Sequence, residues 1–277
     1  MKNTLLARLI LLSLVFNFWA SGALASGSIF SKPIVFDESL TVKWNSPKGL
    51  KMLESSQFKA DFYELADYFQ PQINPLYCGA ATSVIILNAM VGNGEAPSQK
   101  DLEVVKPKIF GGGNIEFKTY SQATFFNENT DKIKDRKIIN LANVTLENEN
   151  SAKNFDPGLT LLELRNILSK TYDLNVKMWY VQSSNLETIN KFRKLVKKIV
   201  AEDQKYLIIN FKGEVLKLKT GGHISPVVAF DEASDSVLIL DVAGHKNGWY
   251  WAKIADVVKA MNTRDGQKYR GYLVVTK

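Results

Sequence analysis

The fold is decided by residues 70–88, which read QPQINPLYCGAATSVIILN. Pro71 and Pro75 keep the first part extended and disfavour a helix before Pro75. From Gly79 onward the residues are almost all small or apolar, as in a buried helix. Cys78, the only cysteine in 277 residues, therefore stands where a loop becomes a helix. There the helix dipole and unpaired N–H groups stabilise a thiolate, the nucleophilic form of this side chain.

Residues 1–25 have the composition of a secretory signal. Two basic residues precede an apolar run that is too short to span a membrane, and Ala23-Leu24-Ala25 offers a cleavage site. We expect cleavage after Ala25 and a secreted or periplasmic chain, residues 26–277, with no stable membrane insertion. In that oxidising compartment one cysteine has no partner within its own chain, which favours a reactive thiol.

Composition limits the partners and cofactors of the chain. The formal net charge is +7, but the basic residues form no stripe interleaved with aromatic ones, so we expect no nucleic-acid partner. One cysteine and two histidines without close metal-ligand spacing predict no metal site. We therefore expect no cofactor.

Hydrophobic periodicity predicts helices early in the chain and antiparallel strands late. This order favours an α+β fold: one catalytic domain, 26–277, with a helical lobe at about 50–155 packed on a sheet lobe at about 156–277. Besides the helix that follows Cys78, the expected helices are 55–69, 98–105, 120–126, 160–168, 186–200 and 254–261. The expected strands are 34–36, 40–42, 175–181, 206–211, 223–230, 237–242, 249–251 and 270–276, with the rest of 26–54 irregular.

A β-hairpin carries the candidate base and its orienting acid. His223 begins the first strand, and Asp241 lies near the end of the second. Counted outward from the turn, both fall at the same end, so imidazole and carboxylate lie side by side. A cysteine nucleophile needs such a base and such an orienting group. The other histidine, His245, lies in a glycine-flanked turn, and we expect it at the surface.

Gln72 completes the predicted site. It precedes Cys78 by six residues in the same loop. A side-chain amide at that place can join the backbone N–H of Cys78 in binding a tetrahedral oxyanion.

Several segments carry a family resemblance. YFQPQINPLYCGAAT (68–82), GHISP (222–226), LILDVA (238–243) and RGY (270–272) resemble the catalytic domain of phytochelatin synthases, in the same order and spacing. The likeness spans most of residues 26–277 and is greatest to the short bacterial members. It implies a papain-like cysteine protease fold and a Cys78–His223–Asp241 triad, with Gln72 in the oxyanion hole. It also implies glutathione as the substrate.

The resemblance further implies substrate-binding positions, namely Arg270, Tyr77, Gly79 and Gly222. One position departs from the family, which commonly has arginine three residues after the triad aspartate, where this chain has Gly244. Arg270 is then the basic residue expected to recognise the γ-glutamyl group. Heavy-metal ions such as cadmium are expected only as thiolate complexes of glutathione.

The predicted reaction is transfer of a γ-glutamylcysteinyl group from glutathione to Cys78, with release of glycine. Water is the expected main acceptor, and a second glutathione, which would give phytochelatin, the lesser one. Two other interpretations remain open. One is a secreted peptidase that resembles the bacteriocin-processing cysteine peptidases, and the other is a non-catalytic periplasmic binding module with an inert, buried thiol. A homodimer is a further possibility.

Overall fold

The computed structural model describes residues 40–92, 119–139 and 158–277. These described residues all belong to one compact unit. The predicted signal at 1–25, the predicted helix at 98–105 and the predicted lobe boundary near residue 155 lie outside the described residues. The division into two lobes therefore stays a prediction.

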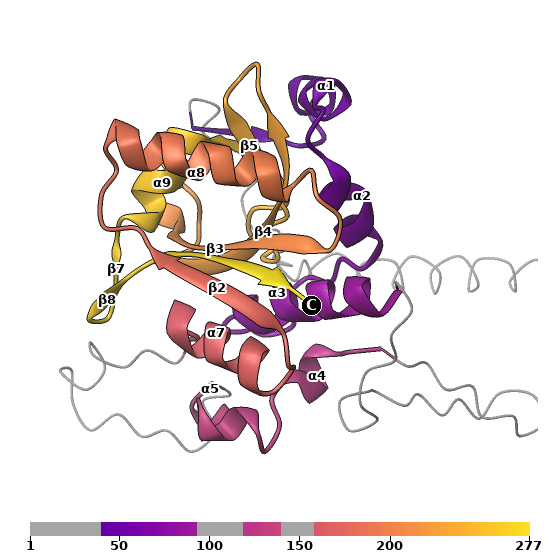
Figure 1. Ribbon diagram of the computed structural model, residues 1–277, viewed down its shortest axis with the longest axis vertical. Helices are drawn as coiled ribbons and strands as arrows, with labels where there is room; N and C mark the ends of the chain where they lie inside the picture. The colour runs from indigo at the N-terminus through magenta and orange to yellow at the C-terminus, as the bar shows by residue number, and fades with distance from the viewer. Residues whose placement is uncertain (1–39, 93–118, 140–157) are drawn as a thin grey trace, which may run out of the picture. The chain divides into compact units, whose positions relative to one another are not determined.

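A seven-stranded antiparallel sheet forms the centre of this unit (Figure 1). Its strands lie in the order β1-β6-β5-β4-β3-β9-β2. The strands β7 and β8 form a separate two-stranded ladder. The bounds are β1 Thr41–Lys43, β2 Asn175–Tyr180, β3 Lys205–Lys212, β4 Gly222–Asp231, β5 Ser236–Ile239, β6 Tyr250–Lys253, β7 Arg264–Asp265, β8 Lys268–Tyr269 and β9 Gly271–Thr276.

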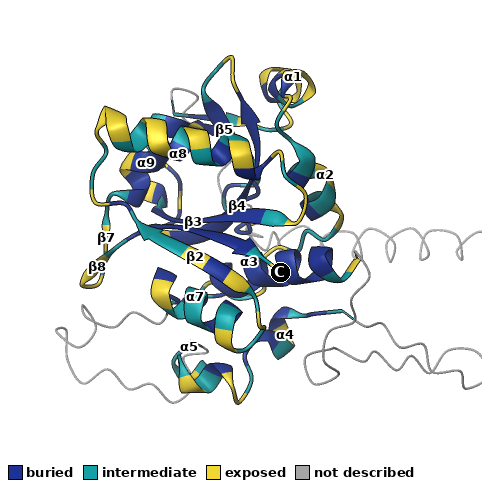
Figure 2. Cartoon of the chain, in the orientation of Figure 1, coloured by how far each residue is buried: buried dark blue, intermediate teal, exposed yellow. Residues whose placement is uncertain are grey.

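Helices cover both faces of the sheet (Figure 1). The helices α3 and α7 pack on one face, and α8 and α9 pack on the other. In Figure 2, α3 is buried almost throughout, whereas the outer side of α8 is exposed. The bounds are α1 Pro47–Ser55, α2 Ala60–Asp67, α3 Cys78–Gly92, α4 Gln122–Phe125, η2 Thr130–Lys132, α5 Arg136–Ile139, α7 Leu161–Lys170, α8 Leu186–Ile199, η3 Gly213–Leu216 and α9 Ile254–Met261.

Two hydrophobic clusters lie on the two faces because side chains alternate along the strands. In β3, Tyr206 and Ile208 face α3 and α7, while Leu207 and Ile209 face α8 and α9. Because both faces of β3 are buried, its sequence is a continuous run of mostly apolar residues. The α+β prediction is confirmed by this arrangement.

The segment before residue 69 differs from the prediction. The expected irregular arm contains the helix α1, because Ser46 caps it by accepting a hydrogen bond from the N–H of Gly49, with Pro47 following. The expected helix at 55–69 is present only as α2. Its first part is extended because Phe58 pairs with Phe230 of β4 as an isolated bridge.

Most later elements agree with the prediction. The helix α7 begins after Thr160, which forms a full capping box with Glu163. The predicted hairpin is β4 and β5, joined by a turn at 232–235. The strand predicted at 40–42 is β1, which pairs with β6.

Candidate active site

Cys78 is the first residue of α3 and is nearly buried, with 9% of its surface exposed. The helix is pinned to β4, the strand that carries His223. Thr82 donates its hydroxyl to the carbonyl of Ile224 at 3.1 Å. Gly79 allows close approach, since a Cβ there would meet the Leu159 side chain at 3.0 Å and that of Ile224 at 3.5 Å. These contacts fix the thiol relative to the histidine strand.

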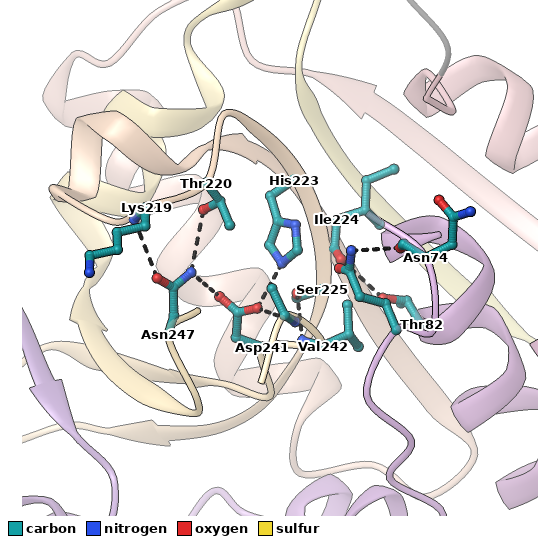
Figure 3. Close-up of polar contacts among 12 residues, drawn as sticks. Asn74, Thr82, Lys219, Thr220, His223, Ile224, Ser225, Asp241, Val242 and Asn247 are labelled. Atoms are coloured by element: carbon teal, nitrogen blue, oxygen red, sulfur yellow. Dashed lines mark hydrogen bonds and ion pairs between the residues drawn. The ribbon is translucent and has the colours of Figure 1, made fainter. Parts of the chain in front are cut away.

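His223 and Asp241 lie side by side, as the hairpin register predicted. Nε2 of His223 donates to Oδ1 of Asp241 at 2.7 Å, and both side chains are buried (Figure 3). A carboxylate can only accept a hydrogen bond, so Nε2 carries the proton and Nδ1 is left for the nucleophile. A hydrogen bond between the His223 and Cys78 side chains completes the row. The structure thus brings the three predicted triad residues together.

The carboxylate of Asp241 has two further donors. Oδ1 also accepts the backbone N–H of Ala243 at 2.7 Å, and Oδ2 accepts Nδ2 of Asn247 at 3.1 Å. Burial opposes the charge of Asp241, but His223 and these two hydrogen bonds outweigh it, so the pKa of Asp241 is lowered. Asp241 therefore stays ionised although it is fully buried.

Burial tends to lower the pKa of His223, but the charge of Asp241 and hydrogen bonds to Asp241 and Cys78 raise it to about 10. The imidazole is therefore protonated at neutral pH. A protonated imidazole beside a sulfur can give its proton to a leaving amine.

Asn247 is a site residue that the sequence reasoning missed. Its amide also donates to Oγ1 of Thr220 at 3.4 Å and accepts the N–H of Lys219 at 3.3 Å, as Figure 3 shows. These contacts tie the loop after Asp241 to the segment before β4. The only local signal was its place in a glycine-flanked turn, which does not indicate a contact with a residue six positions away.

Gln72 lies in the loop that leads to α3. Its backbone N–H donates to the carbonyl of Val242 at 2.9 Å, which ties this loop to the residue after Asp241. Its side-chain Nε2 donates to the carbonyl of Asn74 at 2.9 Å, and Oε1 is buried with no hydrogen-bond partner among the described residues. The amide nitrogen has a second hydrogen, which is available for an oxyanion.

Arg270 is buried beside the strand that carries His223. A Cβ on the exposed Gly222 would meet the Arg270 guanidinium at 2.6 Å, so glycine is needed for this close approach. The guanidinium forms an ion pair with Asp265 at 2.9 Å and donates to the carbonyl of Arg264. Its Nε has no hydrogen-bond partner among the described residues. The predicted substrate-binding residues Arg270 and Gly222 are thus in contact.

Tyr77 is buried next to Cys78, and its ring packs edge-on against Phe126 with centroids 5.2 Å apart. Gly244 and His245 are exposed, the latter as predicted. They line an open pocket of about 550 Å³ together with Phe69 and residues 71–75 of the Gln72 loop. A Cβ on Gly244 would meet Pro71 at 3.7 Å, an ordinary contact, so a side chain can be accommodated there.

Two findings concern the described part of the chain as a whole. None of its helices has the length and apolar character needed to cross a membrane. No three of its histidine, cysteine, aspartate and glutamate side chains are grouped so that they could hold a metal ion.

A thiol at a helix start, beside an imidazole on a strand of an antiparallel sheet and a carboxylate just after the next strand, defines a cysteine-based site in the papain-like arrangement. The sequence model for phytochelatin synthase matches residues 37–272. The chain belongs to the phytochelatin synthase family.

Curated relatives bear names of one kind. Glutathione gamma-glutamylcysteinyltransferase 3 of Lotus japonicus is 25% identical over 259 residues, which is 92% of this chain and 46% of the relative. Glutathione gamma-glutamylcysteinyltransferase of Schizosaccharomyces pombe is 26% identical over 245 residues, 87% of this chain and 48% of the relative. The matched region thus spans less than half the length of these relatives.

Solved structures that are similar to this chain include xylellain, a cysteine protease from Xylella fastidiosa, with 12% identity and a TM-score of 0.34 over 88% of this chain and 93% of that one. This likeness is too low to bear on the fold, which rests on the arrangement described above.

Proposed function

We propose that this chain is a glutathione γ-glutamylcysteine dipeptidyl transferase and hydrolase. The sulfur of Cys78 bonds to the carbonyl carbon of the Cys–Gly amide, and the carbon–nitrogen bond breaks. Protonated His223 gives its proton to the departing glycine nitrogen, and a γ-glutamylcysteinyl thioester remains. Water then attacks the thioester carbon, His223 accepts a proton from it, and the sulfur of Cys78 leaves.

The observation that carries this proposal is the buried row of Asp241, His223 and Cys78, with the 2.7 Å bond between Nε2 and the carboxylate. The pKa of His223, raised to about 10, supports its role as the acid that protonates glycine. Gln72 and the N–H of Cys78 would bind the tetrahedral oxyanion that forms after the sulfur attacks and before glycine leaves.

Family membership and the names of the relatives support glutathione as the substrate. Arg270 would recognise the γ-glutamyl group, since its guanidinium lies against exposed Gly222, the residue before His223. Tyr77 and Gly79 flank the nucleophile and would shape the same subsite.

The choice of acceptor depends on the pocket that includes Gly244. Its lining residues are Phe69, residues 71–75, Gly244 and His245, and none of these is an arginine or lysine. Losing one charge-assisted hydrogen bond costs about 1.5–3 kcal/mol, or roughly tenfold to a hundredfold in occupancy by a carboxylate-bearing acceptor. Water is therefore the main acceptor in this proposal, and a second glutathione the lesser one.

The test is to incubate the mature protein with glutathione and follow free glycine, γ-glutamylcysteine and phytochelatins by mass spectrometry, with Cys78→Ala as the control. We expect glycine and γ-glutamylcysteine in near-equal amounts. Cleavage of a peptide digest without glutathione turnover would instead establish a peptidase. Slow alkylation of Cys78 by iodoacetamide at neutral pH, with no turnover, would establish a non-catalytic module.

The proposal includes export, and it needs no cofactor. Residues 1–25 would be removed after Ala25 and the chain released to the periplasm or medium, which N-terminal sequencing of the mature protein tests. Turnover should persist in a chelator, with cadmium acting only as its glutathione complex. Light scattering tests for the homodimer.

A further inference from the structure

Gln122 binds the backbone of the loop that carries Gln72, the residue proposed for the oxyanion hole. It is the first residue of α4, and only 3% of its surface is exposed. Its Oε1 accepts the backbone N–H of Ile73 at 3.1 Å, and its Nε2 donates to the carbonyl of Pro71 at 2.9 Å. One buried amide therefore bonds the backbone on both sides of Gln72. Only this orientation of the amide satisfies both contacts.

The loop has few other means of holding its shape. Pro71 and Pro75 have no N–H to donate, and residues 69–77 contain no helix or strand. The N–H of Gln72 bonds the carbonyl of Val242, and Asn74 bonds the N–H groups of Leu76 and Tyr77. The backbone of residues 71–73 is thus fixed by Val242, in the segment after β5, on one side and by Gln122 on the other.

Gln122 is itself well anchored. Ser121 caps α4 by accepting the N–H of Thr124 at 3.3 Å. The hydroxyl of Tyr172 donates to the carbonyl of Phe125 at 2.7 Å, and the rings of these two residues stack with centroids 5.2 Å apart. Because α4 is held by these contacts, Gln122 can keep the loop in one position.

We propose that Gln122 is a positioning residue, which acts through Gln72 on the stabilisation of the oxyanion. This inference rests on the proposed acyl-transfer chemistry at Cys78. Gln122 need not touch the substrate. It fixes the backbone from which the Gln72 amide extends, and a misplacement of about 1 Å in such a group can cost on the order of 10²-fold in rate.

Asn88 provides a matched control. It is buried to a similar degree, 4% exposed, and its amide also bonds the backbone of one segment in both directions. Nδ2 donates to the carbonyl of Tyr120 at 3.0 Å, and Oδ1 accepts the N–H of the same residue at 2.8 Å. Neither contact involves the Gln72 loop. Tyr120 lies two residues before Gln122, so loss of this pair should cost stability and reach the Gln72 loop only indirectly, through α4.

The experiment compares Gln122→Met with Asn88→Leu, which remove these hydrogen bonds with little change in the length of the side chain. Both variants should melt at lower temperature than the wild type, because each removes two hydrogen bonds to the backbone. The kcat for glycine release should fall roughly tenfold to a hundredfold in Gln122→Met with KM within about twofold, and by less than about threefold in Asn88→Leu. Alkylation of Cys78 by iodoacetamide, which forms no oxyanion, should proceed at the wild-type rate in both.

A double-mutant cycle separates positioning from general loosening. In a Gln72→Ala background, where the donor is already absent, Gln122→Met should cause almost no further loss of kcat. Equal effects of Gln122→Met in both backgrounds would overturn the inference. If Gln122→Met does not fold, Gln122→Glu replaces it, since it keeps the acceptor for Ile73 and loses only the donor to Pro71.

A second substrate makes the inference independent of glutathione. Acylation of Cys78 by p-nitrophenyl acetate needs an oxyanion hole but no glutathione subsite. Release of nitrophenol without release of glycine would refute the proposed function, and the same variants would then be compared on the ester. A wild-type rate for Gln122→Met on the ester would refute the role of Gln122.

Discussion

Replacement of Asp241 by asparagine removes a charge from the triad while keeping the shape of the side chain. Oδ1 of Asp241 accepts from both Nε2 of His223 and the N–H of Ala243, each at 2.7 Å. The oxygen of an asparagine amide must occupy this position, because an NH₂ group there would face two donors. The tautomer of His223 is therefore kept. The charge is lost, and the NH₂ group takes the place of Oδ2, where the hydrogen bond from Nδ2 of Asn247 is lost as well.

The magnitude follows from the pKa of His223. Burial has the largest effect on this pKa and lowers it. The negative charge of Asp241 has the next largest effect and raises it. Without that charge the pKa should fall from about 10 to 6.5 or below. At pH 7.5 at most about one tenth of the imidazole is then protonated, against nearly all of it in the wild type. We expect kcat/KM at pH 7.5 to fall about tenfold to a hundredfold.

The assay is a pH profile of kcat/KM for glycine release between pH 5 and 10. The alkaline limb should move from near pH 10 in the wild type to about pH 6.5 or lower in Asp241→Asn, so that much of the rate is recovered at pH 6. An alkaline limb that stays near pH 10 would refute the assigned cause of the raised pKa. If Asp241→Asn were as slow as Asp241→Ala at every pH, the conclusion that His223 keeps its tautomer would be wrong.

Three other predictions concern Cys78, Asp61 and Gly244. Cys78→Ser should abolish turnover and leave the melting temperature nearly unchanged, and a wild-type rate in that variant would remove Cys78 from the chemistry. Asp61 is buried with both carboxylate oxygens unpartnered among the described residues, and burial, with Glu64 and Asp203 nearby, raises its pKa to about 9. The fold favours the neutral form of Asp61. The free energy of unfolding that this preference provides is fully present below about pH 4 and is lost as the pH rises towards 9. Asp61→Asn should therefore raise the melting temperature more at pH 8 than at pH 4.5, and an equal shift at both would contradict this assignment. Gly244→Arg should increase the phytochelatin fraction when glutathione and cadmium are in excess, as read by a chromatographic time course. An unchanged fraction would show that the missing arginine does not control the acceptor.

The parts predicted well from the sequence depend on local patterns or on a single hairpin. The helix α3 was predicted because a run of small and apolar residues follows Cys78. The pairing of His223 with Asp241 was predicted because register in a hairpin is set by its turn. In both cases the information lies within about twenty residues of chain.

The parts that were missed depend on long-range contacts. The helix α1 was missed because its first residues, after Ser46, are not a periodic apolar run. Gln122 bonds a loop that lies 49 and 51 residues earlier. A polar side chain that bonds distant backbone leaves no periodic or compositional signal. Asn247 is a milder case, since its contact with Asp241 spans only six residues but passes through an irregular turn.

The position of β9 in the sheet has a consequence for the order of folding. This strand pairs with β3 on one side and β2 on the other, so residues that come last in the described chain join strands that precede them by up to about one hundred residues. At the other end of the sheet, β1 pairs with β6 and Trp251 donates its indole N–H to the carbonyl of Gly49 across 202 positions. Closing such long loops before any contact is gained slows folding. We therefore expect the native sheet to form only after synthesis has passed residue 271, and a chain halted before that residue to be the form most exposed to proteolysis and aggregation.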